Sequence, residues 1–155
     1  MAILVTGGAG YIGSHTCVEL LNAGYDVVVA DNLYNSSKKA VDRVEQITGK
    51  KLKFYEVDLL DQPKVKEIFD KEEIEAVIHF AGLKAVGESV HKPLEYYNNN
   101  ITGTLILCDE MRNTELKILY SVLLQLFTVI RHRSRSQKSA RRERSPILTD
   151  APREC

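Results

Sequence analysis

Four glycines lie within seven positions near the start of the chain, between the apolar run 2–5 and a stretch with helical periodicity, 14–23. A glycine-rich turn lets backbone amides approach a phosphate, and the helix behind it supplies unpaired N–H groups and a partial positive charge. We expect Gly8 to permit the tight turn, Gly10 to let the backbone approach a pyrophosphate, and Gly13 to let the helix pack closely on the strand. These residues predict dinucleotide binding.

One carboxylate completes this pattern. Asp31 ends a second apolar run, 27–30, and lies eighteen residues after Gly13. A carboxylate at that place accepts hydrogen bonds from the adenosine ribose hydroxyls and repels a 2′-phosphate, which favours NAD over NADP. Glycine turns without a ligand are common between a strand and a helix, so a purely structural turn is the alternative. The order of strand, glycine turn, helix, strand and acid favours the binding site.

Candidate site residues also follow the next two predicted strands. Asp58 comes after the alternating run 52–57, and Ala81 and Gly82 follow the run 76–80. Ligands of parallel sheets bind at the carboxyl ends of the strands, so both places belong to the predicted site. Asp58 has an alternative role as a loop cap, which is common for an aspartate after a strand.

Two further groups of polar residues fall inside predicted elements. His79 lies within an apolar strand, and we interpret it as a hydrogen-bonded core residue. Asn98, Asn99 and Asn100 lie within a predicted long helix, 93–112. Asparagine is a poor helix former, so three in a row cost stability. We therefore expect at least one of these amides to hold backbone or ligand near the strand ends.

Strands and helices alternate along residues 1–119. This order predicts an α/β fold with a doubly wound parallel sheet of the Rossmann type, right-handed crossovers and helices on both faces. Ser36 or Ser37 is expected to cap the second helix and Asp61 the third, with Pro63 in its first turn. The predicted strands are 2–5, 27–30, 52–57, 76–80 and one starting at 116–119.

Length and composition limit the class of protein. The 155 residues suffice for one domain. Since the chain has no run of about eighteen apolar residues and no basic segment followed by an apolar stretch, we expect neither a membrane span nor a secretory signal. Cys17, Cys108 and Cys155 are few and far apart. We expect them to be reduced thiols in a cytoplasmic protein and to form no metal site.

Several stretches together resemble the extended short-chain dehydrogenase/reductase family and, within it, the UDP-glucose 4-epimerase branch. The resemblance covers residues 1 to about 119 without a gap, and its motifs are the stretches 5–16, 31–33, 77–89 and 93–100. Other family members that act on nucleotide sugars share the glycine turn but usually differ across 82–89. An enzyme of that kind is an alternative.

The resemblance implies a cytoplasmic isomerase of galactose metabolism, a homodimer when intact, that keeps NAD bound. The enzyme removes a hydride from C4 of a UDP-hexose and returns it to the other face of the sugar. A tyrosine acts as the base, a lysine four residues later lowers the pKa of that tyrosine, and a Ser or Thr assists. Lys84 and the region of Asn99 also match positions near the sugar nucleotide. The positions implied to bind NAD are Gly7, Gly10, Tyr11, Ile12, Gly13, Asp31, Asn32, Leu33, Asn35, Ser36, Asp58, Leu59, Phe80, Ala81, Gly82, Leu83, Lys84 and Asn99.

The catalytic motifs of the family are missing from this chain. The family has Ser-Ser-Ser-Ala-Thr-Val-Tyr-Gly just past the place of Leu119, whereas 120–127 reads Tyr-Ser-Val-Leu-Leu-Gln-Leu-Phe, and no Tyr-x-x-x-Lys occurs after residue 100. The charge changes at the same point. Residues 1–119 hold 13 Lys and Arg against 18 Asp and Glu, and residues 120–155 hold 8 against 3. We therefore assign no catalytic residue. We predict a partial, truncated NAD-binding domain, 1–119, and a disordered non-native tail, 120–155.

The tail has two interpretations. Read as written, 131–146 is rich in Arg and Ser, and the chain is a non-enzymatic NAD-binding module with a basic tail. No aromatic residues interleave these basic residues, so we expect no specific nucleic-acid binding. The second interpretation uses codons. Plausible codons for 117–131, read one frame over from the last base of the Leu119 codon, encode Ile-Phe-Ser-Ser-Ser-Ala-Thr-Val-Tyr-Gly-Asp-Pro, and those for 145–153, read in the same frame, encode Thr-Asn-Pro-Tyr-Gly-Arg-Ser-Lys. Both missing motifs then appear in order, which predicts that residues from about 118 onward are an out-of-frame translation of an epimerase gene whose intact product binds a UDP-hexose.

Overall fold

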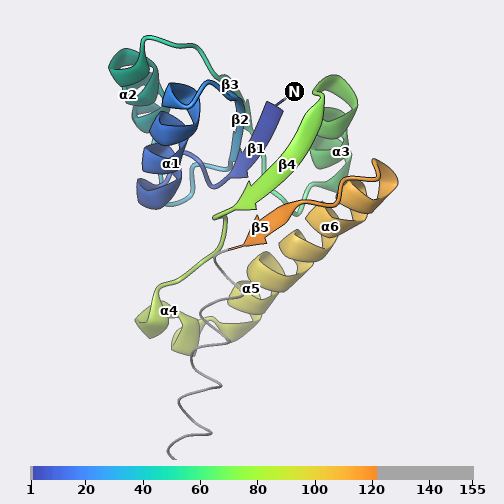
Figure 1. The fold of residues 1–155 in the computed structure, drawn as a ribbon. Coiled ribbons are helices and arrows are strands. Elements are labelled where there is room, and N and C mark those ends of the chain that lie inside the picture. The colour runs from blue at the N-terminus through green and yellow to red at the C-terminus, as the bar shows by residue number, and fades with distance from the viewer. Residues whose placement is uncertain (1, 122–155) are drawn as a thin grey trace, which may run out of the picture. The chain divides into compact units, whose positions relative to one another are not determined.

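The computed structural model describes residues 2–121, and these form a single five-stranded parallel sheet with helices on both faces (Figure 1). The strands stand in the order β3-β2-β1-β4-β5, so the order reverses direction between β1 and β4. The predicted tail, 120–155, lies outside the described residues apart from its first two positions. The strands are β1 (Ala2–Thr6), β2 (Asp26–Asp31), β3 (Lys53–Glu56), β4 (Ile74–His79) and β5 (Leu119–Ser121).

The helices follow the strands in alternation, as predicted. They are α1 (Tyr11–Asn22), α2 (Lys38–Thr48), α3 (Gln62–Lys71), α4 (Val86–His91), α5 (Pro93–Tyr97), a π-helical turn η1 (Asn98–Thr102) and α6 (Gly103–Asn113). None of the helices in 2–121 is long and apolar enough to cross a membrane. The predicted doubly wound α/β fold is confirmed.

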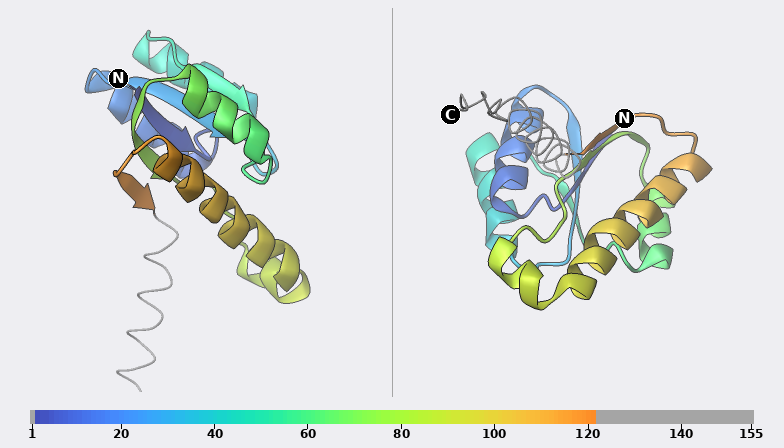
Figure 2. Two further views of the ribbon diagram at one scale, coloured as in Figure 1. Left: turned by 90° about the vertical axis from the view of Figure 1, so that its right-hand side faces the viewer. Right: turned by 90° about the horizontal axis from the view of Figure 1, so that it is seen from below.

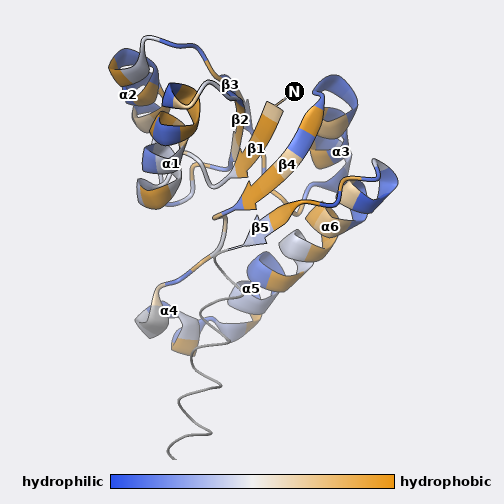
Figure 3. Ribbon diagram, viewed as in Figure 1, coloured by the Kyte–Doolittle hydropathy of each residue, from blue (hydrophilic) through white to orange (hydrophobic). Residues whose placement is uncertain are grey.

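Two apolar layers, one on each face of the sheet, form the core. On one face Leu4 and Val28 pack with Ile68 of α3 and Leu107 of α6. On the other face Val5 and Val29 pack with residues of α1 and α2, such as Cys17 and Val44. Alternate residues of β1 and β2 therefore serve opposite layers, which explains why these strands read as continuous apolar runs. Figure 3 shows the central strands in the hydrophobic colour.

Local signals account for most helix ends. Gly24 has φ +92° and follows α1, and Gly49 ends α2 in the left-handed conformation, as glycine permits. The Ser37 hydroxyl accepts a hydrogen bond from the Lys39 N–H at 3.4 Å and caps α2. Asp61 is the N-cap residue of α3, as predicted, and its carboxylate pairs with Lys64 at 2.7 Å.

The long helix predicted for 93–112 is interrupted at the asparagines. Its middle turn, η1, is π-helical and joins α5 to α6, so that the three pieces run end to end (Figure 2). A π turn contains one extra residue and shifts the carbonyls of the ladder, and such turns gather at functional sites. Helix α4 was not predicted, because its six residues lack a clear apolar period.

Candidate functional site

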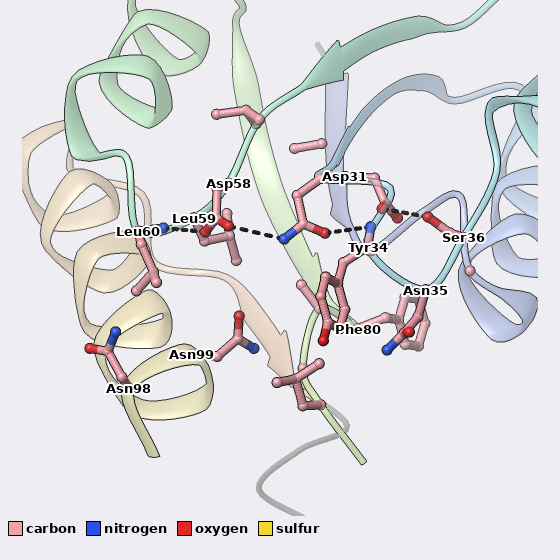
Figure 4. Close-up of a pocket in the computed structure, with 18 of the residues that line it drawn as sticks. Asp31, Tyr34, Asn35, Ser36, Asp58, Leu59, Leu60, Phe80, Asn98 and Asn99 are labelled. Carbon is pink, nitrogen blue, oxygen red and sulfur yellow. Dashed lines mark hydrogen bonds between the residues drawn. The ribbon is translucent and has the colours of Figure 1, made fainter. Parts of the chain in front are cut away.

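A cavity of about 380 Å³ opens at the carboxyl ends of the strands, beside the point where the strand order reverses (Figure 4). Sheets of this kind bind ligands there. Thirteen residues of the predicted site line it: Gly7, Gly10, Asp31, Asn32, Asn35, Ser36, Asp58, Leu59, Phe80, Ala81, Gly82, Leu83 and Asn99.

The glycine turn forms one wall of the cavity. The structure corrects the predicted role of Gly8, because the residue with the left-handed backbone is Gly7, with φ +72°. A Cβ on Gly7 would also lie 2.6 Å from the Ala81 nitrogen. Gly8 is required for packing, since its Cβ would lie 2.7 Å from a methyl of Val29. The predicted close approach at Gly13 is confirmed, because a Cβ there would overlap the carbonyl oxygen of Gly7.

The N-terminus of α1 follows this turn directly. Gly10 is the N-cap residue and supplies no side-chain cap, so the first amides of the helix are left for another acceptor. The helix begins at Tyr11, three residues before the predicted start. Tyr11 and Ile12 lie on its first turn with 82% and 52% of their surface exposed. An anion at this helix end meets unpaired N–H groups and the positive end of the helix dipole.

Asp31 connects the glycine turn to the loop after β2. Its side chain is buried, with 8% of the residue exposed. Oδ2 accepts the Ala9 N–H at 3.0 Å, and Oδ1 accepts the Leu33 N–H at 2.9 Å. Oδ1 also accepts the Ser36 hydroxyl at 2.7 Å (Figure 4). These bonds hold Leu33 at φ +58°, an uncommon conformation for this residue. Each carboxylate oxygen can accept two hydrogen bonds, so Oδ2 keeps capacity for a ligand hydroxyl.

Asp58 caps its own loop and also lines the cavity. Oδ1 accepts the Leu60 N–H at 2.9 Å, which is the loop cap expected of an aspartate after a strand. Oδ2 accepts the side-chain amide of Asn32 at 3.0 Å, and this bond joins the loops that follow β2 and β3 (Figure 4). The carboxylate therefore caps its own loop and fixes a neighbouring wall of the cavity.

The asparagine run holds the loop after β4, as predicted. The Asn100 side chain accepts the Leu83 N–H at 2.8 Å and donates to the Leu83 carbonyl oxygen at 2.9 Å. Asn99 lines the cavity and donates to Asn100 Oδ1 at 3.0 Å. One amide thus fixes both polar backbone groups of Leu83, and with them the cavity wall formed by 80–83.

His79 is the core residue that the sequence predicted. It is 1% exposed, and its ring contacts the Thr6 hydroxyl at 2.6 Å and the Thr104 hydroxyl at 3.0 Å. Burial, together with the positive charge of Lys84, lowers the pKa of His79 to about 4. The imidazole is therefore neutral at physiological pH and is shielded from the cavity, so it is no candidate for a general acid.

Some predicted residues lie outside the cavity lining, and some lining residues were not predicted. Gly13 lies beneath the glycine turn, Tyr11 and Ile12 lie on the first turn of α1, and Leu33 and Lys84 adjoin lining residues. Tyr34 and Leu60 are sequence neighbours of predicted residues, which was the one signal available for them. The unpredicted lining residues are Ala30, Tyr34, Val57, Leu60, Glu95 and Asn98.

The groups that line this cavity are suited to binding a ligand. It combines a helix N-terminus for an anion, a carboxylate with free acceptor capacity for a hydroxyl, and apolar surface from Leu59 and Phe80. Within 2–121 no cluster of His, Cys, Asp and Glu is arranged to hold a metal ion.

Comparisons with known proteins match the same part of the chain. The family model "NAD dependent epimerase/dehydratase family" matches residues 3–139. The chain is 59% identical to a UDP-glucose 4-epimerase of Bacillus subtilis over 153 residues, 98% of this chain and 42% of that protein. It is 69% identical to the Haemophilus influenzae UDP-glucose 4-epimerase over 112 residues, 72% of this chain and 33% of that protein. The chain thus spans a third to two fifths of the length of these relatives.

A solved structure has the same fold. The UDP-glucose 4-epimerase of Bifidobacterium longum, in complex with NAD+ and UDP, superposes with a TM-score of 0.77 and 53% identity, over 78% of this chain and 36% of that one. The likeness therefore covers the sheet, the helices and the cavity described above.

Proposed function

Because the chain belongs to the NAD dependent epimerase/dehydratase family, we propose that residues 2–121 are the NAD-binding part of a UDP-glucose 4-epimerase. The observation that carries the proposal is the cavity at the reversal of strand order, where the glycine turn and the Asp31 carboxylate face one space. The similarity to curated UDP-glucose 4-epimerases supports the substrate class, a UDP-hexose.

The residues present fit NAD. The first amides of α1, at Tyr11 and Ile12, would hold the pyrophosphate, since Gly10 brings no side chain into their path. Asp31 Oδ2 would accept an adenosine ribose hydroxyl. The loops at 32–36 and 58–59 would enclose the adenosine end, and the wall 80–84 with Asn99 would enclose the nicotinamide end. When bound, NAD supplies the acceptor for the hydride that leaves C4 of the sugar. We also include in the proposed NAD site the remaining residues that the sequence predicted for it.

We assign binding, and no catalytic step, to the chain as written. Taking a proton from the 4-hydroxyl needs a positioned base, and in this family that base is a tyrosine with a lysine four residues later, which this sequence lacks after residue 100. The frame change near residue 118 belongs to the same proposal and rests on the codon pattern. The match to the family model and the Bacillus alignment both extend past residue 118, whereas the Haemophilus alignment covers 72% of the chain. Nucleotide sequencing across codons 115–120 decides between a frame change and a native tail.

The experiment that tests the binding function is a calorimetric titration of the 155-residue chain with NAD. We expect saturable binding with one site per chain. The variant Gly10→Val is the negative control and should not bind NAD, because its side chain would enter the proposed pyrophosphate path. The alternative of an NAD-binding module with a functional basic tail predicts the same titration. It also predicts salt-sensitive binding to RNA, which the epimerase proposal does not.

We also propose that the intact protein is a cytoplasmic homodimer. Leu94, Tyr97, Ile101 and Leu105 recur at helical spacing along α5, η1 and α6, and 50–81% of their surface is exposed. A long apolar helical stripe of this kind supports docking of a second copy. The free thiols of buried Cys17 and exposed Cys108 support a reducing compartment. Light scattering on the intact gene product tests the dimer, and Leu94→Glu together with Leu105→Glu should yield monomers.

A further inference from the structure

A continuous chain of hydrogen bonds runs from β1 through the core to the cavity wall. It begins at the Thr6 hydroxyl, passes through the ring of His79 at 2.6 Å and 3.0 Å, and continues from the Thr104 hydroxyl to the Asn100 carbonyl oxygen at 2.6 Å. The Asn100 side chain then binds both backbone groups of Leu83. This series of hydrogen bonds therefore joins a strand, the π turn and a residue that lines the cavity.

The donor and the acceptor of each hydrogen bond in this series can be assigned. The Thr104 hydroxyl has one hydrogen and donates it to the Asn100 carbonyl, so Thr104 Oγ1 accepts from His79 Nε2. His79 Nε2 must then carry the ring proton, and Nδ1 accepts from the Thr6 hydroxyl. Because burial lowers the pKa of His79, the ring is neutral at physiological pH, and its one proton then lies on Nε2.

The same contacts reach the π turn, because the Thr104 hydroxyl bonds to the Asn100 carbonyl within it. A hydroxyl that bonds to the carbonyl four residues earlier competes with the helical ladder and bends the helix. Here that hydroxyl is fixed from behind by a buried ring, so the Asn100 carbonyl is held at one angle. The Asn100 side chain leaves the same residue and meets Leu83, which is seventeen residues earlier in sequence.

We propose that His79 is a positioning residue for the cofactor cavity, acting through Thr104 and Asn100 to fix the backbone of the wall 80–83. This positioning role concerns the site of the proposed function. Only its consequence, tighter binding of NAD, rests on that function. His79 itself touches no ligand, because it lies in β4 behind the wall.

The test uses the complete 155-residue chain and the variant Thr104→Val, which removes the hydroxyl and keeps the shape. Thr48→Val is the matched control, because the Thr48 hydroxyl also donates to the carbonyl four residues earlier, Val44, but on α2 away from the cavity. Thr104→Ser restores the hydroxyl and should restore the wild-type behaviour. Two readouts are taken on each protein, amide hydrogen exchange at Leu83 without NAD and the dissociation constant for NAD.

In Thr104→Val we expect the Leu83 amide to exchange at least about tenfold faster and the NAD dissociation constant to rise about tenfold, the size of one net hydrogen bond. Thr48→Val should change neither quantity. Unchanged exchange at Leu83 in Thr104→Val, or an equal change in Thr48→Val, overturns the proposal. If the wild-type chain binds no NAD, the proposed function fails, while the exchange result still decides the positioning role.

A measurement on the wild-type chain guards against a variant that does not fold. Imidazole ¹⁵N chemical shifts distinguish a protonated from an unprotonated ring nitrogen. We expect the protonated signal at Nε2 and the unprotonated signal at Nδ1. A proton on Nδ1 would reverse the hydrogen bonds described above and refute the role of His79.

Discussion

Acid should destabilise this protein through His79, before its paired carboxylates titrate. The ring is buried in β4 and contacts the Thr6 and Thr104 hydroxyls, and burial, with a contribution from the charge of Lys84, lowers its pKa from 6.5 to about 4. Folding therefore favours the neutral ring. The unfolded chain binds a proton at a pH where the folded chain does not, so the stabilisation is complete above about pH 6.5 and is lost as the pH falls towards 4.

The size of the effect follows from the two pKa values. The interval from 6.5 to about 4, at about 1.4 kcal/mol per pKa unit, corresponds to about 3 kcal/mol of unfolding free energy. Conversion to free energy is appropriate here because the ring is 1% exposed and solvent does not screen it. A domain of this size has roughly 5–15 kcal/mol in total, so acid removes a large share of it.

The assay is urea unfolding of the wild-type chain and of His79→Gln at several values between about pH 7 and pH 4. Glutamine keeps a donor for Thr104 but does not titrate, so it is the matched control. Glu45, Glu72 and Glu88 have lowered pKa values because they bond to Lys or Tyr, but they are common to both proteins and cancel in the difference. We expect the stability advantage of the wild type over His79→Gln to shrink by about 3 kcal/mol across this range. An advantage that stays constant with pH would show that the ring titrates normally and that the reasoning from burial is wrong.

Three other outcomes are expected. Gly13→Ala should destabilise the chain by about 1–3 kcal/mol in the same urea assay, because the new methyl overlaps the Gly7 carbonyl, whereas Gly87→Ala, with open space at its Cβ, should be nearly neutral. In calorimetric titrations the wild-type chain should bind NAD more tightly than NADP by well over about tenfold, or about 1.4 kcal/mol, since the Asp31 carboxylate repels a 2′-phosphate, and equal affinities would remove that role from Asp31. The 155-residue chain should not interconvert UDP-glucose and UDP-galactose in a coupled assay, because a positioned base alone is worth about 10²–10⁴-fold. Restoring one adenine at codon 118, with the downstream gene, should produce turnover, and turnover by the chain as written would refute both the frame change and the assignment of the base.

The sequence predicted the features that depend on local patterns. Apolar runs predicted β1, β2 and β4 to within a few residues, because strands buried on both faces are continuously apolar, and the alternating run 52–57 predicted β3. Asp31 and Asp58 were placed at one edge of the sheet because parallel strands bring their carboxyl ends together. Ser36 or Ser37 was expected to cap the second helix because a hydroxyl before a helix can accept a backbone N–H, and Ser37 does so.

The features that the sequence did not predict depend on contacts between distant segments. Gly7 and Gly8 are adjacent and chemically identical, and what separates their roles is the approach of Ala81 to one and Val29 to the other. The π turn that interrupts the helix at Asn98 ends two residues before Thr104, which meets His79, and the spacing of this pair carries no local period. Side-chain tautomers and bends of this kind arise only when the packed core exists.

The walls of the cavity are held by the protein itself, and this separates binding from catalysis along the chain. Asp31 ties the glycine turn to the loop after β2, Asp58 ties that loop to the next, and Asn100 ties the wall at Leu83 to the π turn. Each of these bonds joins two segments within 2–121, so these walls of the cavity are held by bonds among the described residues. In the proposed function, the base that moves a proton comes from later in the chain. If the reading frame changes near residue 118 as proposed, the chain keeps the binding geometry without the base, and the NAD titration and the activity assay should give opposite answers on the same protein.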